Sequence, residues 1–200
     1  MWETKRNYKM NTNTLFAQYF TENPMWQSIN FDVFHCGFIV WVGPDDIALM
    51  KTKLKEYIDD NVANGAKYVK DPCKDLDEAL TDCQRVGARG MTIWEGKRYK
   101  NRTHFMFIIT KHTNGGMPHD DELLGIISHE SDHMADYVVA MCRLNPTRVV
   151  PCEVHAYIVA HAVRKIMSFF NWKMILKFFK DKFESEKEKD FQEGLKNDNS

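Results

Sequence analysis

The sequence lacks a hydrophobic run long enough to cross a membrane. A membrane-spanning helix needs about 20 consecutive, mostly apolar residues, and no stretch of the chain approaches this. The first twenty residues carry positive charge but have neither a continuous hydrophobic core nor a small-residue cleavage site, so they do not read as a signal peptide. We therefore expect no transmembrane segment and a cytoplasmic location.

The chain also lacks an excess of charge of either sign. It has 27 basic and 28 acidic residues, which gives a net charge of −1. Nucleic-acid-binding domains usually carry a clear basic surplus. We therefore predict no nucleic-acid partner.

Cysteines are few and are not spaced as metal-binding pairs. Five of them in a chain without a secretion signal indicate free thiols rather than a disulfide framework. They lie at positions 36, 73, 83, 142 and 152.

The amino-acid composition is that of an ordinary globular domain. Of 200 residues, 44% are apolar and 12% aromatic, and no internal repeat or second domain is visible. We predict one domain over residues 1–183, followed by a charged, flexible tail over 184–200. From residue 168 the pattern is amphipathic, which favours a helix packed on the domain or on a protein partner over one lying on a membrane.

The first half of the chain indicates a small sheet and a backing helix. Residues 31–43 are rich in β-branched and aromatic types, which predicts one buried strand with His35 in the sheet or core rather than as a ligand. Asp45 or Asp46 is expected to cap a helix from Ile47 to about residue 62. A short strand near 67–69 and a helix near 75–85 follow. Residues 91–94 and 104–111 read as a hairpin.

The central motif is His129-Glu130-Ser131-Asp132-His133. Residues four apart lie one turn from each other on a helix, so His129 and His133 share a face and can bind one metal ion. Glu130 points sideways from that face, beside the position of a metal-bound water. This H-E-x-x-H pattern places two zinc ligands next to a carboxylate base. The alternative is a set of polar residues on a surface helix.

Residues 104–165 resemble the gluzincins, the thermolysin-like zinc metallopeptidases. In that family a glutamate on the next helix, about twenty residues on, is the third zinc ligand. Here Glu153 follows His133 at that spacing, in a segment that is also similar to small phage-encoded peptidases. The resemblance implies an α+β, zincin-like fold. It comprises a small N-terminal mixed sheet with a backing helix, then the H-E-x-x-H helix and the glutamate helix.

One position departs from the family pattern. Thermolysin-like enzymes carry an aspartate one turn after the glutamate ligand, and Tyr157 stands there in this chain. Asp136, two turns beyond His129, is a candidate for supporting that histidine instead. Cys152 adjoins Glu153 but points about 100° away on a helix, so we do not expect it to be a ligand. The face of Glu153, Ala156, Tyr157 and Ala160 is expected to approach the metal helix.

The resemblance implies a peptidase with one zinc ion per chain, held by His129, His133 and Glu153, with Glu130 as the general base. The donor that stabilises the carbonyl oxygen stays open among Tyr137, His155, Tyr157 and His161. One alternative is a non-catalytic structural or interaction protein on the same scaffold, for instance a virion-associated phage component. Another is a hydrolase whose substrate is not a peptide.

The strand at 104–111 has two interpretations. In zincins the strand before the metal helix is an edge strand that binds an extended peptide, and this strand stands at that place in the sequence. The alternative is an interior strand.

Overall fold

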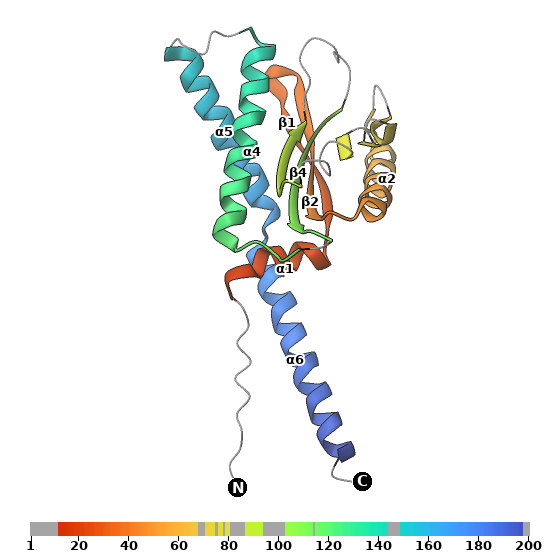
Figure 1. Cartoon of the computed structure of the whole chain (residues 1–200). Coiled ribbons are helices and arrows are strands. Elements are labelled where there is room, and N and C mark those ends of the chain that lie inside the picture. The colour runs from red at the N-terminus through yellow and green to blue at the C-terminus, as the bar shows by residue number, and fades with distance from the viewer. Residues whose placement is uncertain are drawn as a thin grey trace.

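The chain forms a four-stranded sheet with helices on both faces (Figure 1). The computed structural model describes residues 12–67, 71–74, 76–77, 79–80, 87–93, 103–113, 115–143 and 149–197. Its α+β class agrees with the prediction. The elements are η1 Thr12–Thr14, α1 Leu15–Glu22, β1 Met25–Phe31, η2 Asp32–Phe34, β2 Cys36–Pro44, α2 Ile47–Ala63, β3 Gly90–Ile93, β4 His104–Lys111, α4 Asp120–Met141, α5 Val149–Phe169 and α6 Trp172–Asn197.

The sheet is mixed, with strand order β1-β2-β4-β3. β1 and β2 are antiparallel, β2 and β4 are parallel, and β3 is antiparallel to β4. The predicted hairpin of residues 91–94 and 104–111 is therefore confirmed in its pairing. The edge-strand interpretation of 104–111 is wrong, because β4 lies between β2 and β3. Among the described strands, β3 forms that edge.

The predicted single strand over 31–43 is wrong, because the chain reverses within it. Phe31 ends β1, a short 3-10 helix follows, and β2 starts at Cys36. His35 makes the reversal in the left-handed region with φ of 50°, and it is exposed rather than buried in the sheet. Histidine is among the few non-glycine residues that enter this region with some frequency. The turn is hidden in the sequence because its neighbours are aromatic and β-branched.

One face of the sheet is covered by α2, the predicted backing helix. Asp46 caps it by accepting a hydrogen bond from the backbone N–H of Leu49 at 3.0 Å, as expected. Met50 and Leu54 of this helix are buried against the sheet, where they pack with Trp41. Residues 72–74, 76–77 and 79–80 are helical and pack on the same face; part of the helix predicted for 75–85 and the strand predicted near 67–69 lie outside the described residues.

The other face is covered by α4 and α5, which lie side by side, and by α1, which crosses below them (Figure 1). The first turns of α6 pack into the same core. Aromatic side chains hold the junction of α1 with the end of α5: Phe16 and Phe20 stand at 4.8 and 4.7 Å from Phe170, measured between ring centroids. α4 and α5 run in opposite directions and pack along their length. The motif spans the border of the buried face of α4: Glu130 and Ser131 are buried, whereas His129 and Asp132 are exposed.

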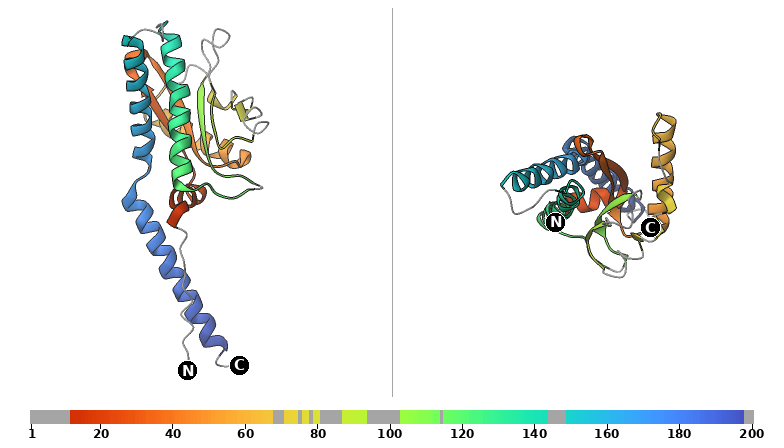
Figure 2. Two further views of the ribbon diagram at one scale, coloured as in Figure 1. Left: turned by 60° about the vertical axis from the view of Figure 1, so that its left-hand side comes forward. Right: turned by 90° about the horizontal axis from the view of Figure 1, so that it is seen from above.

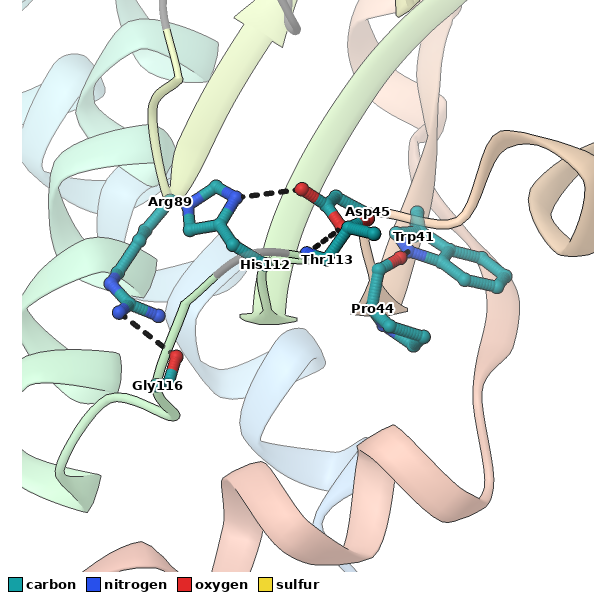
Figure 3. A network of polar contacts seen from close by, with 7 residues as sticks. All are labelled: Trp41, Pro44, Asp45, Arg89, His112, Thr113 and Gly116. Carbon is teal, nitrogen blue, oxygen red and sulfur yellow. Dashed lines mark hydrogen bonds and ion pairs between the residues drawn. The ribbon is translucent and has the colours of Figure 1, made fainter.

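A set of polar contacts ties the ends of β2 and β4 together (Figure 3). The carboxylate of Asp45 accepts hydrogen bonds from the backbone N–H and the hydroxyl of Thr113, both at 2.6 Å, and contacts Nδ1 of His112 at 2.9 Å. Partial burial raises the pKa of Asp45, but these hydrogen bonds outweigh it and hold the pKa below its usual value. These contacts hold His112 and Thr113, just after β4, against the end of β2.

α6 projects away from the rest of the molecule (Figure 2). Ile175 and Phe179 are buried against the domain, while the remainder extends outward. The helix continues to Asn197, through most of the segment expected to be a flexible tail. Charge alternation favours such an exposed helix, as in the Lys180–Glu184 pair at 3.9 Å. None of the helices, over the residues described, is long and apolar enough to cross a membrane.

Candidate metal centre

The motif lies on α4, and its two histidines converge. Nε2 of His129 and Nε2 of His133 are 3.2 Å apart, and the ring centroids are 4.6 Å apart. His129 is exposed and His133 half-buried. Two imidazole nitrogens that meet at the surface of one helix can bind a single divalent ion from the solvent side. The two-histidine part of the predicted site is therefore assembled.

Glu130 points from the same helix toward the sheet edge. Its residue surface is only 3% exposed. The hydroxyl of Thr92 on β3 lies 2.7 Å from Oε2 of Glu130 and donates to it. Burial raises the pKa of the Glu130 carboxyl, although the hydrogen bond from Thr92 and the nearby His133 and His129 act in the opposite direction. The carboxylate is thus a stronger base than an ordinary glutamate.

A glycine on β3 makes room for this carboxylate. A Cβ atom placed on Gly90 would lie 2.7 Å from Oε1 and 2.9 Å from Cγ of Glu130, and 2.5 Å from Cγ2 of Ile126. These distances are shorter than side chains tolerate, so only glycine permits this approach of strand to helix. Gly90 and Thr92 are two apart and face α4 together. The edge strand therefore positions Glu130 by two features of its sequence.

Glu153 is not assembled with the histidines. It lies on α5, where its side chain is exposed. His155, two residues further on, contacts α4 through Asp136 at 3.2 Å. Since successive helical residues turn by about 100°, Glu153 points almost opposite to His155 and away from α4. Among the described residues, one group of three possible metal ligands has its ligand atoms within 4.8 Å of one another. It consists of Asp132, Asp136 and His155, and Glu153 is not part of it.

The packing of α5 explains this placement. The residues that α5 buries are Ile158, Ala162 and Ile166, each with no exposed surface. The predicted contact face is wrong, because Ala156 and Ala160 are exposed and Tyr157 is 64% exposed. Isoleucine buries more apolar surface than alanine, so the helix turns its isoleucine stripe inward. The small residues that suggested a close approach lie on the solvent side.

A separate group of two aspartates and a histidine lies between α4 and α5. Nε2 of His155 is 3.2 Å from Asp136 and 3.5 Å from Asp132, and the three ligand atoms lie within 4.8 Å of one another. Asp136 therefore pairs with His155, whereas the sequence suggested it as a support for His129. The side chains of both aspartates are 56% exposed. The side chains of Asp132, Asp136 and His155 thus meet between the two helices, and the sequence shows only that the two aspartates are four residues apart.

The remaining candidate residues are spread over two places. Tyr137 lies one turn beyond His133 on α4, and its hydroxyl is 2.6 Å from Nε2 of His104 on β4. His161 stacks on Tyr157 with 6.3 Å between centroids and lies beside Phe31. Of the four candidate oxyanion donors, Tyr137 alone belongs to the helix of the histidine pair. Cys152 is an exposed thiol.

The arrangement fits a divalent metal through two ligands. Paired imidazoles suit zinc, and a basic, buried carboxylate beside them suits proton transfer from a water molecule. Glu153, the third protein ligand that the resemblance implies, is exposed on α5 and is not grouped with the two histidines in this structure. Comparison with protein-family models, curated proteins and solved structures finds no match.

Proposed function

We propose that the protein is a zinc-dependent hydrolase of peptide bonds, with its centre at His129, Glu130 and His133 on a zincin-like scaffold. The observation that carries the proposal is the convergence of the two Nε2 atoms at 3.2 Å beside a buried carboxylate. A pair of surface histidines needs no buried acid next to it. A buried acid with a raised pKa is costly for folding and useful for catalysis.

Each residue has a defined task in this proposal. His129 and His133 bind the metal through Nε2. Glu130 accepts a proton from the attacking water and returns it to the leaving amine, a role helped by a pKa closer to neutrality. Thr92 holds the carboxylate in place at 2.7 Å. Bound zinc supplies Lewis-acid chemistry, lowering the pKa of coordinated water to about 7.

The edge strand β3 is the natural place for an extended peptide. An unpaired strand edge offers backbone N–H and C=O groups to an added strand. Thr92, which holds Glu130, belongs to this strand. A peptide added to β3 would therefore run beside the proposed base, which transfers the peptide-edge role from 104–111 to residues 90–93.

Metal content tests the ligand set. We expect about one zinc per chain in the purified protein and a loss in His129→Ala or His133→Ala. Glu153 remains the third ligand that the resemblance implies, and Glu153→Ala tests it directly. Asp121→Ala is the control, because it removes an exposed carboxylate near the start of α4, outside the group of Asp132, Asp136 and His155. Zinc retained in Glu153→Ala as in this control would leave the histidine pair with a ligand other than Glu153.

Glu130→Gln tests the base. The variant keeps the shape of the side chain and can still accept the hydrogen bond from Thr92. We expect the variant to retain zinc but no longer to hydrolyse a broad pool of peptides. Mass spectrometry of the newly formed peptide termini measures this hydrolysis. Turnover equal to the parent protein would remove Glu130 from the mechanism.

A second candidate is a non-catalytic interaction protein on the same scaffold. The observation that favours it is the exposed Glu153, which leaves the metal site one protein ligand short. Absence of zinc after metal supplementation, together with no cleavage of the peptide pool, would make this the better description.

A further inference from the structure

A second site lies at the end of the sheet where the β1–β2 hairpin stands beside the last turns of α4 (Figure 1). Here the structure has a cavity of about 560 Å³. This volume is within the range of small-molecule sites, about 300–1,000 Å³. Strands β1, β2 and β4 contribute walls, and α2 and α4 close the two sides. The cavity is therefore built by the fold rather than by one loop.

The lining of the cavity is selective in charge. None of the described residues that line it is acidic, although the whole chain has 28 acidic residues in 200. Its residues that can carry positive charge are His35, Lys67 and His104. A site with cationic groups and no carboxylates favours an anionic ligand.

The backbone at His35 provides an independent observation. This residue holds φ at 50°, a conformation that costs a side chain free energy and that glycine adopts freely. The imidazole is exposed at the rim of the cavity rather than packed in the core. Strained residues of this kind cluster at binding sites. A contact between the imidazole ring and a ligand would explain why a histidine, and not a glycine, occupies this position.

The inner wall combines a polar pair with apolar surface. The hydroxyl of Tyr137 and Nε2 of His104 are 2.6 Å apart, and the ring of Tyr137 packs edge-on against Phe38 at 5.5 Å between centroids. Tyr57 of α2 lines the opposite side. Apolar walls with a few fixed polar groups are typical of sites that bind small organic molecules.

Gly37 adds a built contact at the hairpin. A Cβ atom on this residue would lie 2.5 Å from Oδ1 of Asn30 and 3.2 Å from the carbonyl oxygen of Ile29. The glycine thus lets the amide of Asn30 lie against β2 at the wall of the cavity. The amide can donate a hydrogen bond to an anionic oxygen.

We propose that this cavity binds a small organic anion, with its carboxylate or phosphate group among His35, Lys67 and His104 and its apolar body against Phe38 and Tyr57. The site is separate from the histidine pair of α4 and does not depend on the proposed hydrolysis. It makes the protein a receptor for a small acid as well as a candidate hydrolase.

The test uses three probes with the same aromatic body: benzoate, phenyl phosphate and the neutral benzamide. Each is titrated into the full chain and followed by ¹⁵N-HSQC spectra. We expect at least one anion to bind with a Kd of about 1 mM or tighter and benzamide to bind at least tenfold more weakly. The tighter of the two anions identifies a carboxylate or a phosphate as the preferred group.

Variants locate the binding. His35→Gly removes the imidazole and relieves the backbone conformation, so Tm is expected to stay or rise while affinity falls at least fivefold. Lys67→Met is expected to weaken the anion in the same way, and Lys55→Met, an exposed lysine of α2 that does not line the cavity, leaves it unchanged. His129→Ala retains the binding, which excludes the histidine pair as the site of the anion.

Four results would overturn the proposal. The first three are no binding of either anion up to about 10 mM, equal affinity for benzamide, and unchanged affinity in both His35→Gly and Lys67→Met. The fourth is a loss of binding in His129→Ala, which would move the anion to the motif.

Discussion

At the scale of single residues, Gly90 is the position on which the geometry of Glu130 depends most directly. An alanine there would bring its Cβ within 2.7 Å of Oε1 of Glu130. We expect Gly90→Ala to displace the carboxylate from Thr92 and to destabilise the protein by about 1–3 kcal/mol, the usual cost of overpacking. Urea unfolding measures the change.

Gly125 is the matched control for Gly90. It lies in the interior of α4, and a Cβ atom there would meet nothing within 4 Å. Because alanine favours a helix over glycine, Gly125→Ala is expected to stabilise by about 0.5–1 kcal/mol. Equal effects of the two substitutions would contradict the close approach of β3 to Glu130.

Glu130 itself is expected to reduce stability at neutral pH. Its pKa is raised in the folded state by burial, so its contribution to stability is complete below the unfolded pKa and is lost as the pH rises through the folded value. Glu130→Gln should therefore raise the stability of metal-free protein near pH 7, and this gain should vanish near pH 3.5. A variant less stable than the parent at neutral pH would argue that the carboxylate is structural.

At the scale of elements, the contacts of Asp45 predict an acid-sensitive junction between β2 and β4. The pKa of Asp45 is lowered in the folded state, so its stabilisation is complete above the usual pKa of aspartate and is lost as the pH falls through the folded value. Asp45→Asn is expected to cost about 1–3 kcal/mol near pH 7, because it weakens hydrogen bonds to a charged group.

Chemical unfolding at two pH values checks the Asp45 prediction. The difference between Asp45→Asn and the parent should shrink once the solution is more acidic than the folded pKa of Asp45. Thr113→Ala is the companion variant, since it removes one hydroxyl donor at 2.6 Å and keeps the charge. A stability difference between Asp45→Asn and the parent that grows in acid would mean that folding raises the pKa of Asp45 instead of lowering it.

The elements also show how far the sequence could predict the structure. Periodicity and capping were sufficient for α2 and for the helix of the motif, where local signals agree with packing. They failed at His35, because an aromatic, β-branched segment concealed a left-handed turn. They could not give the order of the strands within the sheet. An edge position therefore remained possible for β4, although β3 occupies that edge. Pairing order depends on contacts distant in sequence.

The same limit applies to the candidate metal centre. Spacing of four within one helix was enough to predict the meeting of His129 and His133, because both lie on the same rigid element. The direction in which Glu153 points depends on how a second helix, α5, is rotated about its axis. That rotation is set by which residues are turned inward, and the structure buries Ile158 rather than Ala156. Residue spacing between two helices does not determine it. Thr92 and Gly90, which hold Glu130, carried no signal in the sequence.

At the scale of the whole molecule, the two candidate sites share α4 and β4. Tyr137 of the anion cavity lies four residues, one helical turn, beyond His133. On β4, His104 lines the cavity, and Met106, two residues on, pairs with Thr92 beside Glu130. One helix and one strand therefore position both sites, so a ligand in the cavity would contact the elements that carry the motif.

The inner part of α6 packs on the domain, whereas its outer part does not (Figure 2). Phe179 is 6% exposed in the core, whereas Phe183, one turn later, is 39% exposed. We expect Phe179→Ala to cost about 3–5 kcal/mol, the usual cost of a large core truncation. Ending the chain after Ser185 should leave the melting temperature nearly unchanged, because the removed part projects from the domain (Figure 2).

Thermal unfolding distinguishes these two variants of α6. A large loss of stability on truncation would mean that the outer part packs on the chain. Stability retained after truncation would instead assign the outer helix a task other than folding. Met174, Leu176 and Phe183, large apolar residues that are 56%, 59% and 39% exposed, all precede Ser185. The truncation retains them, so its effect reports on the charged outer part of α6 alone.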